Sequence, residues 1–234
     1  MPTPSTVGPN FTAEKVDHPK SLRLVVGAGM LVLSAWAFGA IAEDVVTGDP
    51  LVLVDARVSS WFDAHSTPGW THVMQFLTAL GSFPMVAAVS LSLAAYFWRR
   101  QWWSWMSMLV LTVGGSEILS VLLKHAFHRT RPHFTHPIVT LTSFSFPSGH
   151  TMAATTLYGF LAVWVLVNVQ SWRLRVSAIG GAAILIVLVA ISRIYLGAHF
   201  LTDVAAAIAA GVAWLALSVT ALGAHRRIKS LNGA

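Results

Sequence analysis

Apolar positions along the chain gather into six stretches, each about as long as a helix needs to cross a bilayer. A spanning helix takes roughly 20 mostly apolar residues. The stretches approximately cover residues 22–42, 73–98, 102–123, 151–169, 176–194 and 200–224. Gly81 and Pro84 fall inside the second stretch and predict a kink there. The pattern therefore predicts an all-α fold, a bundle of six transmembrane helices.

A shorter segment between the first two stretches has a different pattern. Its apolar residues recur at helical spacing, at Leu51, Val54, Val58, Trp61 and Phe62. Its charged residues lie between them, at Asp55, Arg57 and Asp63. This pattern predicts a short amphipathic helix on the outer membrane surface between helices one and two. We expect it to act as a structural clamp, with a sill for lipid entry as the alternative.

The ends of the chain lie outside these stretches. Residues 1–20 are rich in Pro, Ser, Thr and charge, and we expect them to form a flexible cytoplasmic tail. Residues 21–229 are then one six-helix membrane domain, and residues 230–234 are a short C-terminal tail.

The composition fits a membrane protein and excludes several other classes. Hydrophobic residues make up 55% of the chain and charged residues 10%, against about 25% charged residues in soluble domains. So few charged residues cannot cover the surface of a water-soluble domain, which excludes a soluble globular protein. The high hydrophobicity also excludes a disordered chain, because disorder needs low hydrophobicity. The chain has no cysteine, which excludes disulfide scaffolds, thiol catalysis and cysteine-ligated metals.

The positive charges predict the orientation. Ten of the fifteen Lys and Arg residues fall on the side that holds both termini: Lys15, Lys20, Arg23, Arg99, Arg100, Arg173, Arg175, Arg226, Arg227 and Lys229. The positive-inside rule makes that side the cytoplasm. Because orientation explains the net charge of +6, we expect no nucleic-acid partner.

Several other ionisable residues fall at the outer ends of the predicted helices. They are Lys124, Arg129, Arg131, His150, Arg193, His199 and Asp203. Helices three and five end there and helices four and six begin there, so one face of the bundle collects these groups. Ionisable residues at membrane depth are functional candidates by default.

These residue types suit phosphate chemistry. His199 and Asp203 share a helical face, so the carboxylate can fix one imidazole tautomer and leave the other nitrogen as a nucleophile or base. The alternative is a structural hydrogen bond. Lys124, Arg131 and Arg193 supply three positive charges that suit a phosphate. Their alternative is to snorkel to lipid headgroups.

Pro147-Ser148-Gly149-His150 opens the fourth helix. Ser148 can cap that helix, Gly149 lets the backbone approach a ligand, and free amides at a helix N-terminus bind anions. The assembled set indicates phosphoryl transfer in which cations replace the magnesium used elsewhere.

Three motifs together resemble the signature of the type-2 phosphatidic acid phosphatase superfamily. They are Lys124-(six residues)-Arg131-Pro132, Pro147-Ser148-Gly149-His150, and Ser192-Arg193-(five residues)-His199-(three residues)-Asp203. The block from Lys124 to Asp203 that holds the motifs is about a third of the chain, and the six-span layout resembles the small bacterial lipid phosphatases of that family.

The resemblance implies a role for each matching residue. His199 would be the nucleophile that forms a phosphohistidine, Asp203 would orient it, and His150 would be the general acid and then the base. The phosphoryl oxygens would be bound by Lys124, Arg131, Ser148, Gly149 and Arg193. Family members need no metal, so no cofactor is expected.

The expected function is hydrolysis of a terminal phosphate of a lipid phosphate or diphosphate at the extracytoplasmic face of the plasma (inner) membrane. Undecaprenyl diphosphate is the first choice of substrate, with phosphatidylglycerophosphate and phosphatidic acid as alternatives. A non-catalytic lipid-phosphate carrier and a phosphatase for a soluble sugar phosphate also stay open. The expected partners are the substrate and membrane lipids, and the sequence does not fix the oligomeric state.

Other polar residues near the motifs have less specific expectations. His125, His128, His133 and His136 cluster in one loop without carboxylates, which favours a solvated loop over a metal site. Arg129 either assists substrate binding or faces lipid headgroups. Glu117 either lines the cavity, pairs with a cation or makes a structural hydrogen bond.

Overall fold

The computed structural model describes residues 18–48, 50–134, 138–139 and 141–232, with side chains between residues 24 and 222. These residues form nine α-helices and one π-helical turn, and no strand occurs among them. The elements are α1 (His18–Thr47), α2 (Pro50–Ala64), α3 (Pro68–Ala79), α4 (Phe83–Arg99), α5 (Trp103–Leu109), η1 (Val110–Gly114), α6 (Gly115–Phe127), α7 (Gly149–Asn168), α8 (Trp172–Tyr195) and α9 (Leu201–Asn232). The expected N-terminal tail lies outside the described residues as far as residue 17.

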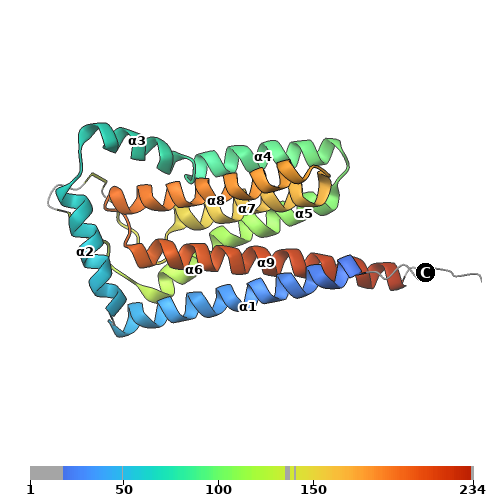
Figure 1. Cartoon of the computed structure of the whole chain (residues 1–234), viewed down its shortest axis with the longest axis horizontal. Helices are drawn as coiled ribbons and strands as arrows, with labels where there is room; N and C mark the ends of the chain where they lie inside the picture. The colour runs from blue at the N-terminus through green and yellow to red at the C-terminus, as the bar shows by residue number, and fades with distance from the viewer. Residues whose placement is uncertain (1–17, 49, 135–137, 140, 233–234) are drawn as a thin grey trace, which may run out of the picture.

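Six helical segments are long and apolar enough to cross a membrane, as predicted. They are Leu24–Thr47, Pro68–Arg99, Trp103–Phe127, Gly149–Asn168, Trp172–Tyr195 and Leu201–Leu222. The long helices run along one another, and α2 crosses one end of the bundle (Figure 1). We call this the α2 end. The chain is therefore a multi-pass, all-α membrane protein, and the helix predicted between the first two spans is present.

The second span is broken rather than kinked. Helix α3 ends at Ala79 and α4 begins at Phe83. A Cβ atom on Gly81, in this break, would lie 2.7 Å from the carbonyl oxygen of His150. Only glycine allows such a close approach, so the break between α3 and α4 packs directly on the start of α7.

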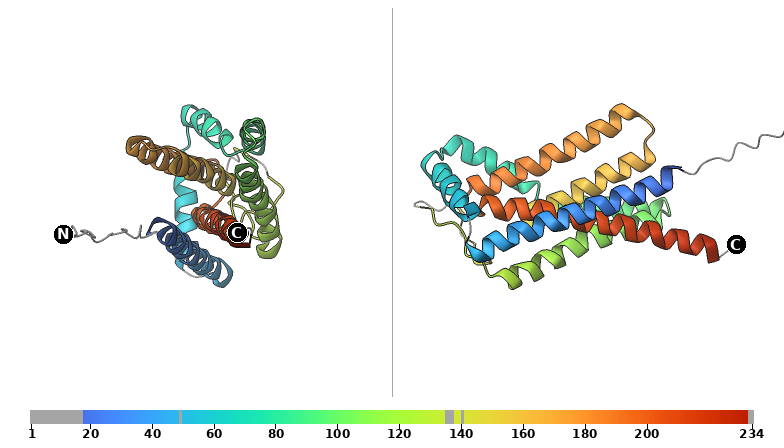
Figure 2. Two further views of the ribbon diagram at one scale, coloured as in Figure 1. Left: turned by 90° about the vertical axis from the view of Figure 1, so that its right-hand side faces the viewer. Right: turned by 60° about the horizontal axis from the view of Figure 1, so that its bottom comes forward.

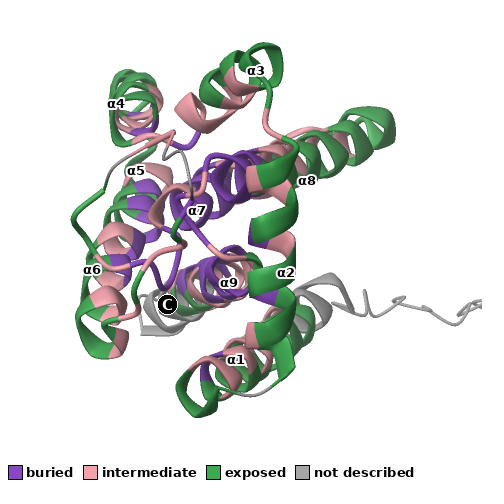
Figure 3. Cartoon of the chain, turned by 90° about the vertical axis from the view of Figure 1, so that its left-hand side faces the viewer, coloured by how far each residue is buried: buried purple, intermediate pink, exposed green. Residues whose placement is uncertain are grey.

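Helices α7 and α9 form the centre of the bundle. Their purple, buried segments are surrounded by α1, α4, α6 and α8 in the view from the α2 end (Figure 3). Small residues let them approach closely: a Cβ atom on Gly211 would lie 2.8 Å from Thr155, and one on Gly159 would lie 2.6 Å from Leu215. The two helices that carry His150 and Asp203 are therefore fixed against each other.

Two further views agree that α1 and α9 lie side by side (Figure 2). The first described residues of α1 and the last of α9 both lie at the end away from α2 (Figure 1). The basic residues Arg99 and Arg100, at the end of α4, and Arg173 and Arg175, at the start of α8, also lie at that end. The assignment of this end to the cytoplasm stays a prediction.

Candidate active site

Hydrogen bonds join the three motif segments at the α2 end of the bundle. The Ser148 amide donates to the Asp203 carbonyl at 3.1 Å, which ties the start of α7 to α9. The Ser145 amide donates to the Arg129 carbonyl at 2.8 Å, and the His199 amide to the Arg193 carbonyl at 3.3 Å. The predicted site residues therefore meet in one place, although they are up to 79 positions apart in the sequence.

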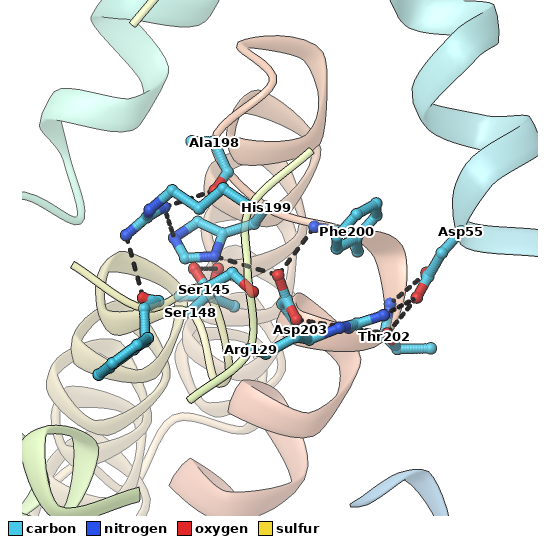
Figure 4. Close-up of polar contacts among 12 residues, drawn as sticks. Asp55, Arg129, Ser145, Ser148, Ala198, His199, Phe200, Thr202 and Asp203 are labelled. Atoms are coloured by element: carbon cyan, nitrogen blue, oxygen red, sulfur yellow. Dashed lines mark hydrogen bonds and ion pairs between the residues drawn. The ribbon is translucent and has the colours of Figure 1, made fainter. Parts of the chain in front are cut away.

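His199 and Asp203 form the pair expected from their spacing. Nδ1 of His199 lies 3.4 Å from Oδ2 of Asp203, which also accepts the Phe200 amide at 2.9 Å (Figure 4). Because the carboxylate is an acceptor, Nδ1 carries the proton and Nε2 keeps its lone pair. The distance is at the long end for a hydrogen bond, as is common for catalytic contacts without substrate.

Arg131 lies on the other side of the imidazole. Its Nη1 is 3.3 Å from Nε2 of His199 and also donates to the Ala198 carbonyl at 2.5 Å. Its other nitrogens donate to the Ser143 carbonyl at 2.7 Å and the Phe144 carbonyl at 3.1 Å. A phosphoryl group on Nε2 would therefore meet a guanidinium that is already oriented.

Burial keeps the His199 imidazole neutral. Burial lowers the pKa of His199 to about 4; the contact with Asp203 acts in the opposite direction, and the charges of Arg193 and Arg131 lower the pKa further. At neutral pH the ring is therefore uncharged, with a free lone pair on Nε2. Burial also lowers the pKa of the Arg131 guanidinium, against the opposing effect of Asp203.

Two more cations reach the same place. Nζ of Lys124 donates to the Phe144 carbonyl at 2.7 Å. Arg193 is only 4% exposed, and its Nη1 donates to Oγ1 of Thr78 at 2.8 Å. Its Nε is buried with no hydrogen-bond partner among the described residues. Buried donors are almost always paired, so an anion that accepts from this nitrogen would complete the site.

The start of α7 faces these cations. Ser148 is the N-cap residue, but its hydroxyl makes no capping bond and instead accepts from the Thr151 hydroxyl at 3.0 Å. The expected side-chain cap is therefore absent. The first hydrogen bond of the helix runs from the Met152 amide to the Ser148 carbonyl, so the amides of residues 149–151 precede it and are suited to an anion.

Gly149 and His150 complete this helix end. A Cβ atom on Gly149 would lie 3.5 Å from Oγ of Ser120 and 3.9 Å from Cε of Lys124. The His150 side chain is half-buried, and the positive charges of Lys124, Arg131 and Arg193 act on it. It is thus within the same polar cluster as His199.

Arg129 lies in this cluster, as its place at the outer end of the bundle predicted, and Asp55 joins it, contrary to the sequence interpretation. The Arg129 guanidinium lies between two carboxylates, 2.6 Å from Asp203 and 2.7 Å from Asp55 (Figure 4). The pattern had put Asp55 on the polar face of α2, but it is fully buried. No sequence signal links Asp55 to Arg129, because Asp55 lies 74 positions away on α2 and belongs to none of the three motifs.

Other polar residues near the site have simpler surroundings. The rings of His125 and His128 pack edge-on against Phe144, and His136 lies outside the described residues. Within the described part of the chain, no three His, Asp or Glu side chains group as metal ligands would. Glu117 is half-buried on α6, without a hydrogen-bonding partner among the residues the structure describes.

An apolar groove of about 200 Å³ lies between α1, α6 and α9. Its lining residues are Leu31, Ala35, Phe38, Leu119, Leu123, Ala210, Ala213, Trp214 and Leu217. Leu123 directly precedes Lys124 on α6. Four of the lining residues, Phe38, Leu119, Leu123 and Ala210, pack in one hydrophobic cluster with Met152, two positions after His150, so the groove lies close to the start of α7.

Comparisons with known proteins agree with this arrangement. The model of the PAP2 superfamily matches residues 105–227. The chain is 37% identical to phosphatidylglycerophosphatase B of Bacillus subtilis (strain 168) over 58% of this chain and 68% of that protein. It is 30% identical to decaprenylphosphoryl-5-phosphoribose phosphatase of Mycolicibacterium smegmatis over 69% of this chain and 74% of that protein.

Solved structures give the same result. The crystal structure of a transmembrane PAP2 type phosphatidylglycerolphosphate phosphatase from Bacillus subtilis superposes with a TM-score of 0.73 and 29% identity. The match covers 81% of this chain and 94% of that chain. The structure of Aquifex aeolicus LpxE, at 20% identity and a TM-score of 0.56, shares the fold.

Proposed function

The chain belongs to the PAP2 (type-2 phosphatidic acid phosphatase) superfamily, as its motifs predicted, and we propose that it hydrolyses lipid phosphates without a metal, through a phosphohistidine at His199. Two contacts of one imidazole carry the proposal. Nδ1 faces the Asp203 carboxylate, and Nε2 faces the Arg131 guanidinium. A neutral ring between these partners is a nucleophile aimed at a phosphate site.

In the first step, the lone pair of Nε2 attacks phosphorus and the bond from phosphorus to the lipid oxygen breaks. His150 donates a proton to that oxygen, and the lipid leaves as an alcohol or a monophosphate. Asp203 stabilises the positive charge that develops on the ring of His199. The fixed charges of Lys124, Arg131 and Arg193 stabilise the phosphoryl oxygens in the transition state.

In the second step, water attacks the phosphohistidine. His150, now neutral, takes a proton from that water, and the bond between Nε2 and phosphorus breaks. Inorganic phosphate leaves, and His199 returns to its neutral form. The same histidine therefore acts first as acid and then as base.

The relatives and the apolar groove both support a lipid substrate. The two named relatives act on a glycerophospholipid phosphate and on a decaprenyl phosphosugar phosphate, according to their names. We therefore test phosphatidylglycerophosphate first, and undecaprenyl diphosphate and phosphatidic acid beside it. The groove between α1, α6 and α9 is lined by apolar side chains, which suits a hydrocarbon chain.

The proposed location is the plasma (inner) membrane, with the α2 end on the extracytoplasmic side. The basic residues at the opposite end, Arg99, Arg100, Arg173 and Arg175, support this orientation through the positive-inside rule. In this orientation the substrate phosphate reaches His199 from the outer leaflet.

The test is phosphate release by purified protein in detergent with EDTA present. The substrates are phosphatidylglycerophosphate, undecaprenyl diphosphate, phosphatidic acid and glucose 6-phosphate. We expect release from at least one lipid by the wild-type protein and none by His199→Gln. Strict dependence on added magnesium would contradict the mechanism, and lipid binding without release would favour the carrier.

A further inference from the structure

Asp55 is a fully buried carboxylate on a helix that lies across the end of the bundle. It is 0% exposed, whereas its neighbours Val54 and Arg57 on α2 are exposed. Burial of a carboxylate is costly unless the group is paired and hydrogen-bonded. Asp55 must therefore have partners inside the bundle, and the structure shows three contacts.

All three contacts join α2 to the residues around His199. Oδ1 of Asp55 accepts the Thr202 amide at 2.9 Å, and Oδ2 accepts the Thr202 hydroxyl at 2.5 Å. Oδ2 also accepts from Nη2 of Arg129 at 2.7 Å. Thr202 directly precedes Asp203, so Asp55 holds the first turn of α9 from the side.

The guanidinium of Arg129 makes contacts with four residues, Asp203 among them. Its Nη1 donates to Asp203 at 2.6 Å and to the Thr202 hydroxyl at 2.6 Å, its Nη2 donates to Asp55, and its carbon Cζ lies 4.5 Å from the centre of the Phe200 ring. The side chain is 11% exposed. Both terminal nitrogens of Arg129 thus point at Asp203, Thr202 and Asp55, and not at Nε2 of His199, which Arg131 faces.

We infer that Asp55 and Arg129 are positioning residues that hold the Asp203 carboxylate in the orientation required to orient His199. This inference rests on the proposed function. Nη1 of Arg129 donates a hydrogen bond to Oδ1 of Asp203, which leaves Oδ2 facing Nδ1 of His199. The carboxylate cannot rotate without breaking a charge-assisted hydrogen bond of 2.6 Å.

The carboxylate of Asp55 also weakens the pull of Arg129 on Asp203, because the guanidinium interacts with both carboxylates. With both Asp55 and Asp203 beside it, the guanidinium is shared between two anions. Without the charge of Asp55, Arg129 would interact with Asp203 alone and draw its electron density away from His199. Asp203 would then accept less strongly from Nδ1–H, and the Nδ1–H tautomer would lose its stabilisation.

The test compares Asp55→Asn with wild type, with Arg57→Gln as a matched control. The amide nearly preserves the shape of the carboxylate and removes its charge, and Arg57 is an exposed residue two positions away on the same helix. Steady-state kinetics are measured on the best lipid substrate. The tautomer of His199 is read from ¹⁵N-histidine NMR, and its signals are assigned by their absence in His199→Gln.

We expect Asp55→Asn to lower kcat by about 10- to 100-fold with KM within about twofold, because the substrate does not touch Asp55. The NMR signals of His199 should shift toward the Nε2–H tautomer. Arg57→Gln should match wild type in both measurements. Arg129→Lys, which keeps the charge but cannot reach both carboxylates as a fork, should resemble Asp55→Asn.

Each outcome decides the inference. A folded Asp55→Asn protein with wild-type kcat and wild-type His199 signals overturns it, and so does failure of both variants to fold, since the pair would then be structural. If only Asp55→Asn fails to fold, Arg129→Lys decides. A wild-type protein that releases no phosphate overturns the proposed function instead, and the tautomer comparison still tests the positioning.

Discussion

Nη1 of Arg131 lies 3.3 Å from Nε2 of His199, on the side of the ring opposite to Asp203. The nucleophilic lone pair therefore faces the cation that would receive the transferred phosphoryl group. The two residues are 68 positions apart, and the contact forms because the segment after α6 returns to the start of α9.

Replacement of His199 by Gln should abolish turnover. The amide keeps much of the polar volume but has no nucleophilic lone pair, so we expect kcat to fall by at least about 10³-fold. Reactions with ³²P-labelled lipid, quenched in alkaline SDS, should show a base-stable, acid-labile phosphoprotein in the wild type alone. Labelled protein in His199→Gln at wild-type levels would place the nucleophile elsewhere.

Arg131→Lys should lower kcat/KM by about 10²-fold, in the range seen when one oxyanion donor is removed. Lysine keeps the charge but loses the fork that meets phosphate oxygens and Nε2 together. Arg57→Gln provides the control, and thermal unfolding checks that the loop held by Arg131 is intact. Wild-type kinetics in Arg131→Lys would show that only the charge matters at this position.

The protonation of His199 should depend on pH as its burial dictates. Its pKa in the folded protein is about 4, below the ordinary value of 6.5. The unfolded chain thus binds a proton from pH 6.5 downward that the folded protein does not yet bind. The contribution of neutral His199 to the free energy of unfolding is therefore fully present above pH 6.5 and is lost as the pH falls toward 4.

The titration can be followed by ¹⁵N-histidine NMR, in which His199 should stay neutral down to about pH 5. A midpoint near 6.5 would show that the ring is solvated. In parallel, the denaturation midpoint of the wild type should fall between pH 6.5 and 4 by more than that of His199→Gln, which lacks the titrating group.

Ala35→Trp should weaken the hydrolysis of lipid phosphates and leave that of short-chain phosphates unchanged. Ala35 is an exposed residue of α1 that lines the apolar groove, so a large side chain there can fill the groove without entering the core. We expect KM for a lipid phosphate to rise about tenfold and hydrolysis of a short-chain phosphate to stay unchanged. Ala40→Trp, an exposed position of the same helix outside the groove, is the control; an equal effect there would refute the groove as a chain site.

The orientation can be tested with single cysteines, because the chain has none. Ala64→Cys lies at the end of α2, and Gln170→Cys lies between α7 and α8; both positions are exposed. In spheroplasts a membrane-impermeant maleimide should label Ala64→Cys and should label Gln170→Cys only after lysis. The reverse pattern would place the α2 end in the cytoplasm.

The sequence predicted the membrane spans and the motif residues because these depend on local information. Six apolar stretches are sufficient to identify six spanning helices, and Gly81 marked the position where α3 and α4 separate. His199 and Asp203 lie one helical turn apart, so their contact followed from spacing alone. Lys124, Arg131 and Arg193 could be grouped because each lies at, or a few residues after, the C-terminal end of a predicted helix that ends on the same side of the bundle.

Only the tertiary structure decided which buried groups pair with each other. Asp55 follows the charged pattern of an amphipathic surface helix, yet it is fully buried and paired with Arg129. Arg129 looked like a cation for substrate or headgroups, yet two carboxylates occupy it. The period of a helix fixes which face a side chain is on, but the packing of α2 against α9 fixes whether that face meets water or an ion pair.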